Sequence, residues 1–121
     1  MFRLGVIEES LENQDTLGIL KPFFFSQRIA EVPGDEWPVW HINEYHVPDG
    51  KMAKLLPILE QQVKPTAYIH AFNESELVVT LRGRSFNISP HKDTTWDEMI
   101  EYGFSVGVGR DYLENIPLNI N

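Results

Sequence analysis

The chain has 121 residues, a length that suits a single domain spanning 1–121 with a core of its own. Its 18 acidic and 10 basic residues give a formal net charge of −8, which argues against binding to nucleic acids or anionic membranes. Because it has no cysteine, no signal-peptide pattern and no apolar run near the ~20 residues of a membrane span, we expect a cytoplasmic protein without disulfides.

The first third of the chain predicts a strand, a helix and a hairpin. Residues 2–8 place apolar side chains at alternate positions, which is typical of a strand. Residues 10–21 predict a helix that ends at the following proline. Aromatic and β-branched residues then favour strands at 23–32 and 37–47, and a Pro-Gly-Asp turn between them predicts a hairpin.

The middle of the chain predicts a second helix and three more strands. Apolar residues at spacings of three and four indicate a helix over 50–63 with one buried face. Pro57 lies inside this pattern, so the helix either kinks there or begins later. Strands are expected at 66–73, 76–81 and 85–89, with tight turns between them.

The last segment predicts a helix followed by an irregular tail. Two threonines and two acidic residues form a helix start at residue 94, and the apolar pattern carries the helix to residue 103 or 106. The tail over 107–121 is expected to be irregular, apart from a short strand at 118–120.

This element order predicts an α+β protein. The first six elements, β-α-β-β-α-β, match a split β-α-β (ferredoxin-like) layout, in which an antiparallel sheet carries its helices on one face. An extra C-terminal hairpin and helix would extend one edge of the sheet. The other face would be open to water, a partner or a ligand.

The alternation of side chains assigns residues to these two faces. Ala67, Ile69 and Ala71 are small or branched and suit the face beneath the helices. With them would lie Trp40 and Ile42 of the earlier strand. The polar and aromatic residues would then occupy the open face. A slip of one residue in any strand would reverse its assignment.

The polar and aromatic side of the sheet supplies the candidate site. Its members are His41, Tyr45, Tyr68, His70, Thr80, Arg82 and Arg84. An arginine there can bind a carboxylate or phosphate, and a histidine can exchange a proton near neutral pH. Tyrosine and arginine are equally typical of protein interfaces. Three interpretations of this side of the sheet therefore stand: a protein interface, a ligand pocket, or a face covered by the chain's own tail.

No motif predicts a reaction. The four histidines lack the spacing of a metal site, the serines lack a nucleophile context, and the glycines at 103–109 do not follow a strand, so we expect no catalytic residue, metal or other cofactor. We expect an interaction or regulatory module that forms a homodimer or binds a protein partner through the open face or an edge strand. The alternative is a small-molecule-binding domain or small enzyme with a pocket of His70, Tyr68 and Arg82.

Overall fold

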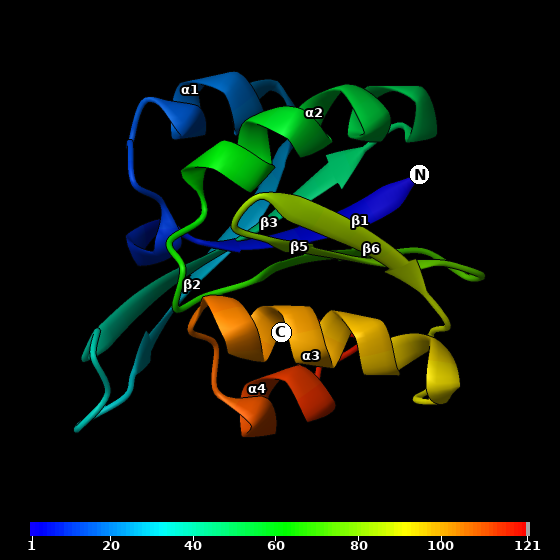
Figure 1. The fold of residues 1–121 in the computed structure, drawn as a ribbon. Helices are drawn as coiled ribbons and strands as arrows, with labels where there is room; N and C mark the ends of the chain where they lie inside the picture. Colours follow the sequence, from blue (N-terminus) through cyan, green and yellow to red (C-terminus); the bar gives the residue numbers. More distant parts are fainter. Residues whose placement is uncertain (121) are drawn as a thin grey trace.

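The structure, a computed structural model, describes residues 1–120. Its strands are β1 (Phe2–Ile7), β2 (Phe24–Glu31), β3 (Val39–Val47), β4 (Ile69–Phe72), β5 (Leu77–Leu81) and β6 (Arg84–Ile88). Its α-helices are α1 (Thr16–Leu20), α2 (Asp49–Gln62), α3 (Asp97–Val106) and α4 (Arg110–Glu114). The strands form one antiparallel sheet in the order β2-β3-β1-β4-β5-β6, with α1 and α2 on one face and α3 and α4 on the other (Figure 1).

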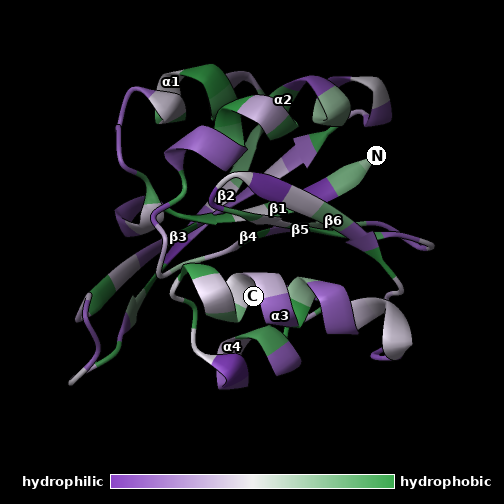
Figure 2. Cartoon of the chain, in the orientation of Figure 1, coloured by the Kyte–Doolittle hydropathy of each residue, from purple (hydrophilic) through white to green (hydrophobic). Residues whose placement is uncertain are grey.

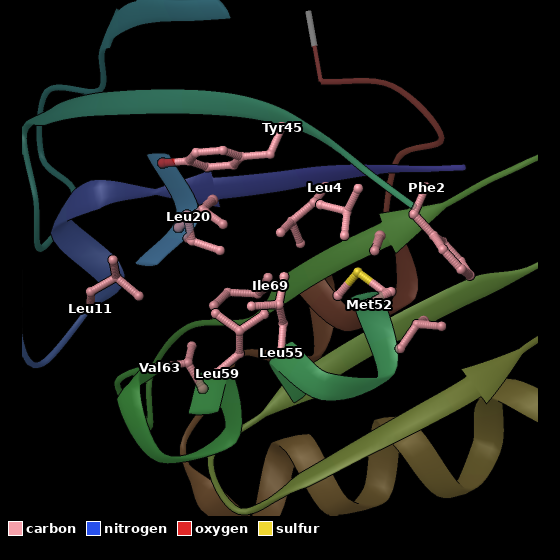
Figure 3. Close-up of a cluster of buried hydrophobic side chains, with 14 of the residues drawn as sticks. Phe2, Leu4, Leu11, Leu20, Tyr45, Met52, Leu55, Leu59, Val63 and Ile69 are labelled. Carbon is pink, nitrogen blue, oxygen red and sulfur yellow. The ribbon is translucent and has the colours of Figure 1, made fainter. Parts of the chain in front are cut away.

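The first core lies between the sheet and the layer of α1 and α2. The α2 residues Met52, Leu55 and Leu59 are buried, at spacings of three and four. They lie over strand residues such as Leu4 and Ile69, as Figure 3 shows. The predicted apolar stripe is thus confirmed. The helix continues through its internal proline, because that proline lies on the exposed side, where the freed carbonyl meets solvent.

The second core lies on the opposite face of the sheet, beneath α3 and α4. Leu77, Val79 and Leu81 of β5 pack there with helix residues that include Met99 and Leu113. The alternate residues of β5 face the first core, so the whole strand is buried. The prediction of helices on one face only is therefore wrong. A strand such as β5, which is apolar except for Thr80, is typical of a strand covered on both sides.

The third helix is fixed at its start, middle and end. The indole of Trp96 is buried and donates a hydrogen bond from Nε1 to the Ser89 carbonyl at 2.7 Å. Gly103 allows close packing on α4, since a Cβ there would come within 2.8 Å of the Leu113 side chain. Gly107 ends the helix with a φ of 125°, which only glycine adopts readily. Figure 2 shows hydrophobic and hydrophilic residues alternating along α2 and α3, as expected for helices that cover a core.

The face assignment is confirmed for β4 and wrong for β3. On β1, Gly5 pairs with His70 of β4 and with Glu44 of β3, so these two side chains share a face. Ile42, two residues from Glu44, consequently belongs to the second core, whereas Tyr45 belongs to the first. Strand pairing, which the local alternation does not reveal, sets the relative face of the two strands.

The structure confirms an α+β protein with an antiparallel sheet, but the six-strand order differs from the ferredoxin-like layout. The first helix is shorter than predicted, with its α-helical part limited to α1. The tail contains the unpredicted helix α4, and residues 118–120 form no strand. Within residues 1–120, no helix is long and apolar enough to cross a membrane.

Candidate functional site

A cavity of about 290 Å³ lies on the α3–α4 side of the sheet. It is bounded by the middle of β1, the β2–β3 hairpin, the chain leading into β4, Tyr112 of α4 and the C-terminal tail. Figure 1 shows this hairpin projecting beyond the helix layers, and residues of its turn line the cavity. The volume lies close to the ~300 Å³ at the small end of ligand sites. We call this feature the His70 cavity.

The imidazole of His70 lies at the base of this cavity and is only 8% exposed. Its neighbour across the strand pair is Gly5, where a Cβ would come within 2.8 Å of His70 Cε1. A side chain at position 5 would therefore displace the ring. A glycine inside a strand often marks such a close approach, and here it makes room for the one buried imidazole that lines the cavity in the described chain.

The environment of His70 defines its protonation state. Burial lowers the pKa of His70 to about 4, so the ring is neutral at pH 7. Its Nε2 lies 3.4 Å from the carbonyl oxygen of Asn119. Because a carbonyl only accepts, Nε2 carries the hydrogen and Nδ1 is left as an acceptor. Among residues 1–120, no group donates a hydrogen bond to that Nδ1.

Aromatic side chains form much of the cavity wall. Trp37, Trp40, Tyr68 and Tyr112 all line it. The ring of Tyr68 packs edge-on against His70, with centroids 5.9 Å apart. Burial raises the pKa of Tyr68 to about 12, so its hydroxyl is neutral at physiological pH. Aromatic walls of this kind offer a ligand large contact areas and π faces.

Asp35 holds the rim of the cavity together. Its Oδ2 accepts hydrogen bonds from the Trp37 backbone N–H at 3.0 Å and from Trp40 Nε1 at 3.2 Å. Its Oδ1 lies 3.4 Å from the hydroxyl of Tyr112, 77 residues away in the chain. One carboxylate therefore orients the hairpin and joins it to α4.

The C-terminal tail covers part of the face that was expected to be open. Arg28 Nε on β2 donates a hydrogen bond to the Ile120 carbonyl at 3.0 Å. The side chain of Ile120 is buried and lies over Gly5. With the Asn119 contact to His70, these interactions place the tail along the cavity. The sequence left three possibilities for what covers this face, and the chain's own tail is one that the structure shows.

The structure separates most of the predicted site residues. It brings together Tyr68 and His70, which point to the same side of the sheet and line the His70 cavity. The others lie elsewhere: His41, Tyr45 and Thr80 on the α1–α2 face, Arg82 in the β5–β6 turn and Arg84 at the start of β6. The expected pocket of His70, Tyr68 and Arg82 does not form, because Arg82 reaches toward the end of α2.

Each separated residue has a structural contact of its own. The pairs are His41 with Glu9 at 2.6 Å, Tyr45 with Asn43 at 2.9 Å, Thr80 with Ser85 at 2.9 Å, Arg82 with the Val63 carbonyl at 3.4 Å and Arg84 with Glu98 at 2.7 Å. The hydrogen bond that His41 Nδ1 donates to the Glu9 carboxylate raises the pKa of His41. The contacts of His41, Arg82 and Arg84 connect the sheet to neighbouring segments, and those of Tyr45 and Thr80 lie within the sheet. None of the five residues lines the His70 cavity.

Sequence reasoning missed several residues of the cavity. Three of them, Gly5, Asp35 and Tyr112, lie far apart in the sequence, so local patterns give no sign that they meet. A fourth, Trp40, was assigned to the opposite face of the sheet. The glycine within the first strand was a usable signal, because strand glycines mark close approaches. No local sequence pattern predicts the contact of Asp35 with α4.

Comparisons with protein-family models, with curated proteins and with solved structures find no match for this chain. The function is therefore inferred from the residues of the cavity and of the sheet edge.

Proposed function

We propose that the protein binds a small molecule in the His70 cavity. The observation that carries this proposal is the buried imidazole at the base of the cavity, whose Nδ1 accepts no hydrogen bond from residues 1–120. A ligand that donates a hydrogen bond to Nδ1 would satisfy this acceptor, and its apolar body would fill the apolar space of the cavity.

Binding fits this site better than catalysis. A histidine whose pKa lies at about 4 is a weak base at pH 7, and general bases work best when their pKa lies near the working pH. The aromatic walls and the apolar side chains of Ile7, Ile42 and Val108 suit the body of a ligand. The proposed role is therefore recognition, with His70 orienting the bound molecule.

A cavity-filling substitution tests this proposal. Ile7→Trp places a large ring in the cavity, because Ile7 lines it from β1. A matched control is Ile19→Trp, at a position that is 46% exposed on α1 and far from the cavity lining. A library of small aromatic fragments is screened by ¹H–¹⁵N correlation spectra of the full chain.

We expect fragments to shift the amide signals of Gly5, His70 and Val108 in the parent and in Ile19→Trp, and the response to be lost in Ile7→Trp. Fragments that shift none of these signals, or that bind Ile7→Trp as well as the parent, would overturn the proposal.

A second candidate function is self-association through the edge of the sheet. Strand β2 has no neighbour on its outer side within the described chain, and its Phe24, Phe25 and Ile29 are 51%, 59% and 62% exposed. Exposed apolar edge strands tend to pair with other strands. We propose a second copy of this chain as the partner, which would make the protein a homodimer and an interaction module.

Light scattering tests the edge-strand candidate. We expect a dimer mass for the parent and a monomer mass for the double variant Phe25→Lys/Ile29→Lys, because lysines on an edge strand oppose strand pairing. The control is Lys21→Glu/Lys51→Glu, at exposed positions outside β2. A parent that stays monomeric at high concentration would exclude the homodimer.

We also propose that β1 to β4, with α1 and α2, are a ferredoxin-like unit that β5 and β6 extend. The order β2-β3-β1-β4 and the placement of both helices on one face support it. The cytoplasmic location expected from the sequence stays a prediction.

A further inference from the structure

We infer that the ligand of the His70 cavity is a small organic cation, an amine attached to an aromatic or apolar body. This inference rests on the proposed binding function and specifies the chemistry of the ligand. It follows from three properties of the cavity: the kind of polar atoms that face it, the balance of charge around it and the unoccupied faces of its aromatic rings.

Two polar groups of the cavity are hydrogen-bond acceptors that a ligand can use. His70 Nδ1 is an acceptor, since Nε2 points to the Asn119 carbonyl. The second is the exposed carboxylate of Glu36 in the hairpin turn, whereas the neighbouring Asp35 already accepts hydrogen bonds from Trp37 and Trp40. A ligand that complements these groups has to supply hydrogen-bond donors. A protonated amine supplies up to three of them from one small group.

Among the residues that line the cavity, carboxylates outnumber cationic side chains. The lining has the two carboxylates of Asp35 and Glu36 and one cationic side chain, Arg28, which donates a hydrogen bond to the Ile120 carbonyl. His70 adds no positive charge, because the buried ring is neutral at pH 7. The whole chain carries a formal charge of −8, which attracts cations to its surface. An anionic ligand would have to approach both carboxylates of the rim.

The aromatic walls suit a cation. Rings of tryptophan and tyrosine attract cations to their faces, and aromatic cages use this to bind ammonium groups. One wall residue already does so within the chain, as Lys64 Nζ lies 5.2 Å from the centre of the Trp37 ring. The rings of Trp40, Tyr68 and Tyr112 have no such partner among residues 1–120. We expect an ammonium group to lie against one of these three rings, near the rim carboxylates.

Three probes with the same ring system separate charge from shape. Tryptamine carries an ammonium group, indole-3-acetate a carboxylate, and indole neither. Binding of each to the full chain is measured at pH 7 by isothermal titration calorimetry, with the amide signals of Gly5 and His70 used to locate the bound probe. We expect tryptamine to bind about tenfold more tightly than indole-3-acetate, and more tightly than indole.

A matched pair of variants tests the role of the rim charge. Glu36→Gln removes one carboxylate from the cavity, and we expect the preference for tryptamine over indole-3-acetate to fall about threefold. Glu31→Gln makes the same change of net charge at an exposed position of β2 outside the cavity, and we expect it to keep the preference of the parent.

The outcomes distinguish this inference from the proposed function. If indole or indole-3-acetate binds as tightly as tryptamine at the same signals, the cation inference is wrong while the binding function stands. Equal effects of Glu36→Gln and Glu31→Gln would also overturn it. If no probe produces saturable binding and the fragment screen fails as well, the binding function itself is wrong.

Discussion

His70 should make the stability of the protein depend on pH between 7 and 4. In the folded protein the pKa of His70 is lowered to about 4 by burial, whereas the ordinary value of 6.5 applies in the unfolded chain. Between these two values the unfolded chain binds a proton that the folded protein does not. Lower pH therefore favours unfolding. The loss of stability caused by His70 begins as the pH falls through 6.5 and is complete below about pH 4.

The size of this effect follows from the two pKa values. The difference between 6.5 and about 4, at ~1.4 kcal/mol per pKa unit, amounts to about 3 kcal/mol at pH 4. About 2 kcal/mol of it is expected by pH 5, where most carboxylates of the chain are still ionised. The pH 5 measurement is therefore the more selective one.

Urea unfolding followed by circular dichroism at pH 7 and pH 5 measures this contribution. The variant His70→Gln lacks the titrating group and keeps a side-chain N–H that can donate to the Asn119 carbonyl. We expect the parent to lose about 2 kcal/mol more than the variant between the two pH values. The absolute stability of the variant does not enter the comparison. An equal loss in both proteins would show that His70 is not buried in the neutral form.

Three further substitutions test the packing and the ion pairs. Gly5→Ala should lower the free energy of unfolding by about 1–3 kcal/mol, measured in urea, because its Cβ would come within 2.8 Å of His70; an unchanged stability would contradict the close approach. Leu59→Ala should lower the free energy of unfolding, measured in urea, by about 2–5 kcal/mol, since Leu59 is fully buried in the first core. Glu44→Ala should cost about 1–3 kcal/mol at pH 7 and less at pH 3, because Arg3 donates two hydrogen bonds to Glu44 and lowers the pKa of its carboxyl. A loss that is equal at both pH values would argue against an ionised Glu44 in the folded protein.

The sequence by itself determined the local structure of most of the chain. Apolar spacing located α2, and the alternation of Ile69 and Ala71 with His70 placed β4 correctly over the first core. It also put Tyr68 and His70 on one side of the sheet, where both line the cavity. These predictions succeeded because side-chain periodicity reports which residues of one element share a face.

Only the tertiary structure decided which faces meet and what covers them. The pairing of Gly5 with both His70 and Glu44 set the relative orientation of β3 and β4. The chain path after β6 carried α3 and α4 to the second face, and the contact of Asp35 with Tyr112 closed the rim of the cavity. Contacts between residues so far apart depend on strand register and on the route of the chain, and neither leaves a periodic signal in the amino-acid sequence.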